Sequence, residues 1–593
     1  MRAARLARAA ALLLVPTLLV GLGLLARAVG GAALRDFTRY ETPFRVPPVG
    51  VPAGPGLARQ VVVVLVDGLG QKASQGLPFL DELRAKGADF DCVVGEPSLS
   101  LPGRAVLFSG AWAEVNGQLS NYNPRPLRVD HLFAAAREQG RLTGLAAGGN
   151  GALLFAPFVD RVVAYGEDAE TAPLAAYEAS LRDHAARSGA LLDEVRGEPG
   201  LVVVELHLVD KAGHGWGARS DEYRRAALRA DDATRGLASR LDLTRDALVV
   251  TADHGHVAAG GHGGPEEDVL HVPLMLAGAG VRPGARGTAR QVDVASTLSA
   301  LLGLPVPGSN QGRPLLDALA LDPAGRVEVL RAVVAQRERF VENYAYRVAT
   351  LDEPKSRSRM IEPEEVAAPE GAGEGWYVAR LGALDAREAQ VKAARTMLEA
   401  EARSRPALVL MFGPLLVAAA LAAARVVSVR HLGRAALAGV AGAALYHAAL
   451  PAAGLAYSFT AVNKDEQLPA FFARDMALGL SACALAVFVA AWRERRASGA
   501  RLLELTGTAW LVTAAFCQVL LVKLSAVFWA QGASVTWRLG DMYWAFGFYL
   551  DLLAVMAVGL CSPLMVLPAW LAALRPVSSS APEAAPARGV VAR

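Results

Sequence analysis

Aspartate and histidine residues, which bind divalent metals, follow three short apolar runs of the chain. The first run ends at Val66, the second at Val204 and the third at Val250. The residues that follow are, in chain order, Asp67, then Asp210 and His214, then Asp253, His254 and His262. A single aspartate after a strand is usually a turn or helix-cap residue. Because ligand sites in open α/β sheets gather outside the carboxyl ends of strands, three such runs together favour a metal site.

A serine nucleophile is predicted at Ser100, within the segment Pro97–Arg104. A serine hydroxyl is a weak nucleophile at neutral pH, but coordination to a divalent cation favours its alkoxide. Ser-x-Pro on its own usually marks a helix start. Both interpretations hold together here, because a helix amino terminus behind Ser100 would turn backbone donors and partial positive charge toward a phosphate. We therefore prefer Ser100 to Ser98.

The composition points to a membrane protein. The chain of 593 residues is 53% hydrophobic with a mean hydropathy of +0.29, which is too apolar for an ordinary soluble enzyme. The apolar run Ala9–Leu25 follows three arginines and fits a cleaved signal peptide or, because apolar residues continue past Leu25, a membrane anchor. Five more candidate spans of roughly the ~20 residues that a bilayer needs lie at 407–424, 435–456, 475–492, 506–527 and 543–573.

Arginine clusters at residues 425–434 and 493–501 indicate the orientation, because positively charged loops stay in the cytoplasm. Six alternating spans then place residues 30–405 outside. The abundance of Ala, Arg and Gly is typical of bacteria with GC-rich DNA, so the predicted location is a bacterial inner membrane with the catalytic domain extracytoplasmic. Within the spans, Lys523 and Asp551 are expected to pair, or Lys523 to snorkel, rather than to bind substrate.

The predicted organisation is an anchor (1–29), a linker (30–58), a catalytic domain (59–320), extracytoplasmic helices and linker (321–405), a transmembrane domain of about five helices (406–574) and a disordered cytoplasmic tail (575–593). The net charge of +3 comes without a clustered basic stripe, which argues against nucleic-acid binding. Of the four cysteines only Cys92 lies in the outer domain, so no disulfide framework supports it.

The order of these motifs resembles the alkaline phosphatase superfamily over residues 59–320. The segments Val209–His214, Ala252–His256 and His262–Gly264, with the Ser-x-Pro-Gly stretch, are most similar to glycosylphosphatidylinositol ethanolamine-phosphate transferases and nucleotide pyrophosphatase/phosphodiesterases. The resemblance implies an α/β sandwich with a central, mostly parallel sheet. The predicted fold is this sandwich plus an α-helical multi-span membrane domain.

The resemblance also implies roles for the residues. One metal would be held by Asp210, His214 and His262. The other would be held by Asp67, Asp253 and His254, and Ser100 would complete that second site. The cofactors are then two divalent ions, and imidazole-rich sites favour Zn²⁺ over Mn²⁺. Ser100 would be phosphorylated transiently. Asn121 would bind a phosphoryl oxygen, although an asparagine beside Asn123-Pro124 is also ordinary loop chemistry.

Some residues depart from the family pattern. His256 stands where the transferases commonly have Met, and we interpret it as structural or as supporting the ligands. Gly103 stands where the phosphodiesterases usually have Asn, which weakens kinship with nucleotide-cleaving members. The histidines at element ends, His131, His207 and His271, are interpreted as structural.

The predicted function is membrane-anchored, two-metal phosphoryl transfer on phosphodiesters through phospho-Ser100. The predicted activity is that of a phosphoethanolamine-type transferase or a phosphodiesterase, and the substrate is a phospholipid or an envelope glycan. One alternative is a sulfatase with formylglycine at Ser100, although sulfatases have paired acids where Asp67 is followed by Gly68. Another is a catalytically silent membrane scaffold. The acceptor and the oligomeric state stay open.

Overall fold

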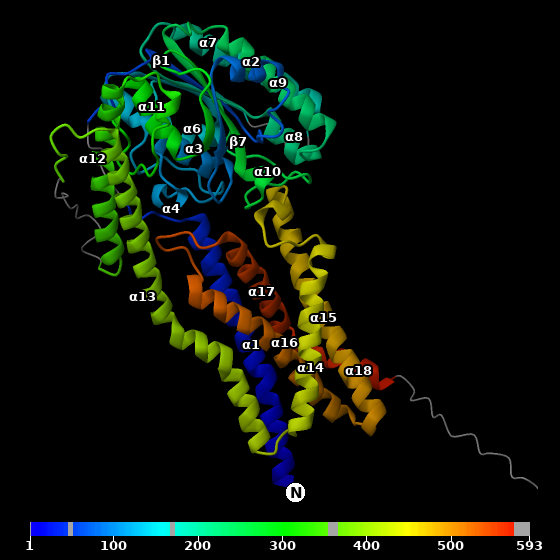
Figure 1. Cartoon of the computed structure of the whole chain (residues 1–593). Coiled ribbons are helices and arrows are strands. Elements are labelled where there is room, and N and C mark those ends of the chain that lie inside the picture. The colour runs from blue at the N-terminus through cyan, green and yellow to red at the C-terminus, as the bar shows by residue number, and fades with distance from the viewer. Residues whose placement is uncertain (1, 45–50, 167–171, 354–365, 575–593) are drawn as a thin grey trace, which may run out of the picture.

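A computed structural model describes residues 2–44, 51–166, 172–353 and 366–574. Figure 1 shows an α/β domain standing on one end of an elongated helical region. Both predicted parts of the fold, the mostly parallel sheet and the separate helical region, are confirmed. The predicted tail and residues 354–365 lie outside the described residues.

The described residues of the outer domain form one eight-stranded sheet. Its strands are β1 (Gln60–Val66), β2 (Ala88–Val93), β3 (Leu142–Gly148), β4 (Arg161–Tyr165), β5 (Gly200–Leu206), β6 (Asp246–Thr251), β7 (His271–Gly278) and β8 (Arg286–Arg290). They lie in the order β4-β3-β5-β1-β6-β7-β2-β8. The first five strands in this order, β4, β3, β5, β1 and β6, are parallel to one another. Strand β7 is antiparallel to both of its neighbours.

The central strands are buried on both faces, as continuous valine runs predict for a covered parallel sheet. In the register of these strands Leu65 on β1 lies beside Glu205 on β5 and Thr251 on β6. Because the three strands are parallel, their carboxyl ends meet at one edge of the sheet. The residues that follow them are therefore brought together.

Helices pack on the sheet in two groups. One group contains α2 (Pro78–Lys86), α7 (Leu174–Glu194), α8 (Leu208–Trp216) and α9 (Asp221–Ala238). The other contains α3 (Ser100–Ser109), α4 (Ala113–Asn116), α5 (Leu132–Glu138), α6 (Gly149–Phe155) and α11 (Asp293–Leu302). The short α10 (Glu267–Leu270) leads into β7. Helices α12 (Pro323–Ala349) and α13 (Glu374–Ala423) then pack together and connect the domain to the helical region.

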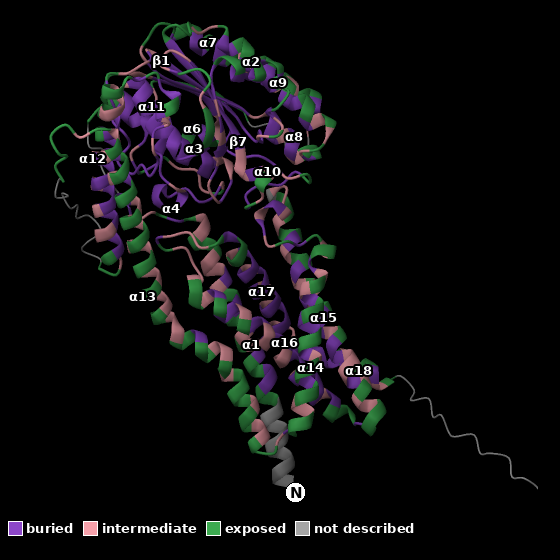
Figure 2. Ribbon diagram, viewed as in Figure 1, coloured by how far each residue is buried: buried purple, intermediate pink, exposed green. Residues whose placement is uncertain are grey.

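The helical region contains α1 (Arg2–Thr38), the second half of α13, α14 (Val429–Ala449), α15 (Leu468–Ser498), α16 (Leu502–Gln531), α17 (Met542–Leu560) and α18 (Val566–Leu574). In the described part of the chain, five helices are long and apolar enough to cross a membrane, namely α1, α13, α15, α16 and α17. On α13 the side chains of Leu408, Val409 and Leu416 are exposed, and Figure 2 shows exposed residues along this helix. Exposed apolar side chains of this kind suit contact with lipid.

Two predicted spans differ from expectation. The span 435–456 lies largely in α14, which is not among these five helices and which carries Arg430 and Arg434 near its start and His447 near its end. The span 543–573 is divided into α17 and α18 by a short turn that contains Pro563. Proline cannot donate a backbone hydrogen bond, so a break at this point is expected.

Lys523 on α16 and Asp551 on α17 form an ion pair, as predicted. Their Nζ and Oδ2 atoms are 2.8 Å apart, and Asp551 is fully buried. Lys523 also donates to the Tyr457 hydroxyl, at 2.7 Å. The pair therefore holds two helices together inside the apolar region.

We expect that Lys523→Met or Asp551→Leu alone lowers the free energy of unfolding by up to about 3–5 kcal/mol, because each leaves a buried charge without its partner. The double variant should be less destabilised than either single variant. Unfolding of the detergent-solubilised protein measures this. Additive losses in the double variant would show that the two charges are not coupled.

Candidate metal-binding active site

Two groups of side chains that could each hold a metal ion lie at the carboxyl edge of β1, β5 and β6. The first, which we call the histidine cluster, consists of Asp210, His214, His256 and His262. The second, the serine-side cluster, consists of Asp67, Asp253 and His254. Six of these seven residues were predicted as ligands, in the same division between two sites. His256 is the addition.

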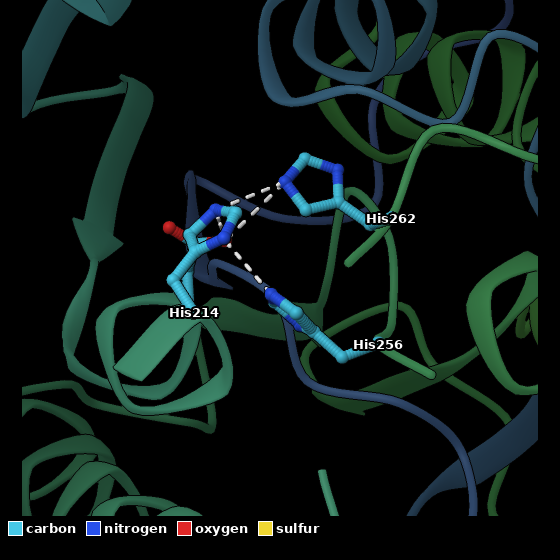
Figure 3. A group of neighbouring side chains, drawn as sticks. His214, His256 and His262 are labelled. Carbon is cyan, nitrogen blue, oxygen red and sulfur yellow. Dashed lines mark hydrogen bonds and ion pairs between the residues drawn. The ribbon is translucent and has the colours of Figure 1, made fainter. Parts of the chain in front are cut away.

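The histidine cluster combines α8 with the loop after β6. Asp210 and His214 lie four residues apart, so they share one face of the helix. The Nε2 atom of His214 is 3.4 Å from Oδ1 of Asp210 and 3.2 Å from Nε2 of His262. Figure 3 shows the rings of His214, His256 and His262 turned toward one another.

Backbone and side-chain oxygens orient these rings. His262 Nδ1 lies 3.1 Å from the Ser98 carbonyl, and His214 Nδ1 lies 3.0 Å from Oδ1 of Asn463. Each Nδ1–H can therefore donate to an oxygen, which leaves Nε2 as the atom with a free lone pair. This is the usual way in which proteins set the tautomer of a metal-binding histidine.

The serine-side cluster lies beside the predicted nucleophile. Ser100 is the first residue of α3, and its hydroxyl is 3.1 Å from Nε2 of His254. The same Nε2 is 3.5 Å from Oδ1 of Asp67. Asp253 and His254 are fully buried, whereas Ser100 is partly exposed and lines a cavity of about 320 Å³. Ser100, the predicted nucleophile, thus lies between the predicted ligands and an open space.

The residues present fit positively charged ions. Several buried polar atoms have no hydrogen-bond partner among the described residues, and those that belong to the two clusters are Asp67 Oδ1, Asp210 Oδ1, Asp253 Oδ2 and His256 Nε2. Buried polar atoms are normally satisfied, so unpaired lone pairs that converge in this way call for a cation. Carboxylate oxygens and imidazole nitrogens are suitable ligands for Zn²⁺.

The carboxylates also perturb one another. Burial and the neighbouring Asp67 charge raise the pKa of Asp253 well above its ordinary value. Burial acts in the same direction on Asp67, but Arg104 and the hydrogen bond from His207 outweigh it and lower that pKa. Burial likewise opposes ionisation of Asp210, yet the surrounding histidines hold its pKa well below the ordinary range. The charge at this edge is therefore too concentrated for all three groups to ionise freely.

Sequence reasoning missed two residues that support Asp67. Arg104 is buried and donates from Nη2 to Oδ2 of Asp67 at 2.6 Å, and its Nε lies 3.3 Å from Glu205. His207 accepts from the backbone N–H of Gly148, so its Nδ1–H donates to the same Asp67 oxygen at 3.0 Å. His207 was interpreted as structural, but it lies in the site. The available signal was the position of Arg104 one helical turn after Ser100.

The other sequence-predicted residues are also placed. Asn121 belongs to the loop after α4 but lies beside the start of α3. Its Oδ1 accepts from the backbone N–H of Leu101 at 3.0 Å, and it lines the same cavity as Ser100. His131 is buried and caps α5. His271 pairs with Asp91 at 2.8 Å, away from both clusters.

The helical region contributes to this cavity. The connection 457–467 between α14 and α15 supplies Phe459 and Asn463, and α1 supplies Phe37. Phe37 and Phe459 stack with ring centroids 5.6 Å apart. Asn463 contacts His214 twice, because its Nδ2 donates to the His214 carbonyl at 2.7 Å in addition to the Nδ1 contact. The site is therefore formed by both parts of the molecule.

Known proteins that resemble this chain include phosphodiesterases and ethanolamine phosphate transferases. Residues 61–267 match the family model for type I phosphodiesterases and nucleotide pyrophosphatases. Human GPI ethanolamine phosphate transferase 1 is 24% identical over 316 residues, which are 44% of this chain and 32% of that protein. The catalytic subunit of human GPI ethanolamine phosphate transferase 2 is 25% identical over 45% of this chain and 29% of its own length. The chain thus spans about a third of the length of these curated relatives.

Solved structures give weaker likenesses. A sulfatase-like protein from Bacteroides thetaiotaomicron matches 44% of this chain and 74% of its own, at 18% identity and a TM-score of 0.37. The alkaline phosphatase PafA matches 44% of this chain and 99% of its own, at 11% identity and a TM-score of 0.37. Murine ectonucleotide pyrophosphatase/phosphodiesterase 5 matches 42% of this chain and 95% of its own, at 14% identity and a TM-score of 0.34.

The residues that match the family model include both clusters and Ser100. The resemblance predicted from the motifs is confirmed. Residues 61–267 therefore resemble type I phosphodiesterases and nucleotide pyrophosphatases, and the curated relatives are ethanolamine phosphate transferases.

Proposed function

We propose that this protein is a membrane-anchored phosphoryl transfer enzyme that acts on phosphodiesters through phospho-Ser100. The observation that carries the proposal is the position of Ser100. Its hydroxyl lies at the amino terminus of α3, beside the serine-side cluster, and it faces a cavity that the histidine cluster also lines. A nucleophile, two cation sites and an anion-favouring helix end therefore share one space.

Each cluster would hold one divalent ion, and zinc suits the mixture of imidazole and carboxylate ligands. When bound, two such ions favour the alkoxide of Ser100 and offset the negative charge of the transferring phosphoryl group. The protein positions everything else. Arg104 and His207 hold Asp67 in place, and the amino-terminal end of α3 places Ser100 at the cavity.

The reaction then has two balanced halves. In the first, Ser100 Oγ forms a bond to phosphorus while the bond to one ester oxygen breaks, and that alcohol leaves with a proton. In the second, an acceptor alcohol or water attacks phospho-Ser100, gives up its proton, and frees the serine. Asn121, which lies beside the start of α3, is the residue that we propose to contact a phosphoryl oxygen.

The proposed substrates are phosphoethanolamine-bearing phospholipids or envelope glycans. The names of the curated relatives support ethanolamine phosphate transfer. The cavity supports it too, because its lining combines polar residues of the outer domain with Phe37, Phe459 and Leu468 from the helical region. We propose that α14 crosses the membrane together with the five apolar helices, because it joins the arginine-rich segment 425–434 to the connection beside the cavity, and that arginines keep the opposite end in the cytoplasm. The outer domain is then extracytoplasmic, beside the head groups.

Ser100→Ala should abolish turnover of a p-nitrophenyl phosphodiester by the zinc-loaded full chain, because no other residue forms the covalent intermediate. The same variant should retain both metals. Matched phosphomonoester and sulfate ester substrates, assayed in parallel, identify the preferred group. Dominant sulfate ester hydrolysis would establish the formylglycine alternative, and metal-loaded protein that is inactive on every ester and on phosphatidylethanolamine would favour a silent scaffold.

Metal affinity should increase with pH. Burial raises the pKa of Asp253. Burial alone would lower the pKa of His214, but the Asp210 carboxylate outweighs this effect and raises the pKa of His214 above its ordinary value. Metal binding requires the deprotonated forms and so releases protons. Competition with a chelator between about pH 6 and pH 8, which brackets the ordinary histidine pKa, should show weaker binding at the acid end. An affinity that does not change over this range would contradict these protonation states.

Asn463→Ala should weaken metal binding at the histidine cluster by about 10–100-fold, the usual effect of losing a partner behind a metal-binding histidine. The reason is that Asn463 holds the Nδ1 side of His214. Val462→Ala is the matched control, because Val462 precedes Asn463 in the same connection and lines the same cavity, but its apolar side chain cannot hydrogen-bond a ring nitrogen of His214. Equal effects of the two substitutions would show that only loop packing matters.

A further inference from the structure

His256 is the residue of the site that the family resemblance leaves without a role. It follows the Asp253-His254-Gly255 motif directly, and its ring is buried in the histidine cluster. Figure 3 shows the ring directed toward His214. A buried histidine with a structural role normally finds a partner for each ring nitrogen.

The backbone is shaped around this ring. A side chain at Gly68, where φ is +77°, would place its Cβ 2.7 Å from the His256 ring, and a side chain at Gly213 would place its Cβ 2.6 Å from it. Both separations are too short for real contacts. The two glycines, one after β1 and one on α8, therefore leave a space that an imidazole fills.

Only one nitrogen of His256 is paired. Nδ1 lies 3.3 Å from the Gly68 carbonyl and can donate to it. Nε2 has no hydrogen-bond partner among the described residues, yet it lies 3.3 Å from Oδ1 of Asp210, which is also unpaired. Two unsatisfied acceptors that face each other across this distance call for something positive between them.

Four of the six separations among the proposed ligand atoms match a tetrahedral ion, and all six are within 4.8 Å. Adjacent ligands around such an ion lie about 3.3 Å apart when the ligand bonds are about 2.0–2.1 Å. Asp210 Oδ1 lies 3.3 to 3.7 Å from the Nε2 atoms of the three histidines. The Nε2 atoms of His214 and His262 are 3.2 Å apart.

We propose that His256 is a fourth protein ligand, so that the histidine cluster is a closed site of one carboxylate and three imidazoles. This rests on the proposed two-metal function and deepens it. Structural zinc sites are closed by four protein ligands, whereas catalytic sites keep a position open. The serine-side cluster has three such ligands and Ser100, so it is the site that keeps a place for the reacting group.

The test uses the full chain in detergent and His256→Phe, which keeps an aromatic ring in the glycine-lined space but has no lone pair. Cobalt(II) replaces zinc as a visible probe of coordination number. The wild-type protein should bind two ions, with the intense visible absorption of a four-coordinate site. His256→Phe should lower the affinity of one site by more than about 100-fold, beyond the 10–100-fold that loss of an outer partner costs. Its remaining cobalt at that site should absorb weakly, as five- or six-coordinate ions do.

The control is His207→Phe, since His207 supports Asp67 from outside the clusters and should alter only the serine-side site. Unchanged affinity of the other site in His256→Phe shows that the variant is folded. Wild-type affinity and spectrum in His256→Phe would overturn the inference but leave the proposed function standing. A wild-type chain that binds no metal would instead overturn the proposed function.

Discussion

The arrangement of the whole site depends on one electrostatic constraint: four carboxylates meet in a buried space at the carboxyl edge of the sheet. Asp67, Glu205, Asp210 and Asp253 are all buried, and the buried cation that contacts three of them is Arg104. When ionised, four carboxylates against one guanidinium leave three negative charges. Two divalent cations more than balance them and leave one positive charge, which suits the single negative charge of a phosphodiester.

The same constraint explains why the protein builds its supports where it does. Burial of an unbalanced carboxylate is costly, so Asp67 takes hydrogen bonds from both Arg104 and His207. The histidines have a different requirement, which is to keep a lone pair available for a cation. Each must stay neutral with Nε2 free, and a carbonyl or amide oxygen accepts from its Nδ1–H. One of these oxygens belongs to Asn463 in the helical region, so docking of that region and the state of the metal site are linked.

The sequence was sufficient to predict residues whose positions follow from strand ends. Asp67 and Asp253 come directly after valine-rich strands, and parallel pairing brings such positions together whatever the details of packing. Ser100 was predictable for a similar reason, because a helix start beside the sheet edge is local chemistry. The mostly parallel sheet and the apolar helices follow from the same patterns of valine runs and hydropathy.

The residues that were missed act across long separations or hide in ordinary patterns. Asn463 lies 249 residues from His214, and no local signal connects them. In the sequence Arg104 is an ordinary residue of a predicted helix, and only the fold shows that its guanidinium contacts the buried carboxylates of Asp67 and Glu205. The span predicted at 435–456 stays a prediction, because α14 is long enough to cross a membrane but is not among the five helices that are also apolar enough.

Both clusters open onto one cavity, which limits the directions from which a substrate can approach. The serine-side cluster reaches the cavity through the partly exposed Ser100, and the histidine cluster reaches it through Asp210, His214 and His262. A leaving or attacking oxygen can approach only from the cavity. That cavity is bounded on one side by Phe37 and Phe459, so an acceptor that arrives from the apolar helices reaches phosphorus on the face turned toward the helical region. Under the proposed function, such an approach suits a membrane-held alcohol as the acceptor.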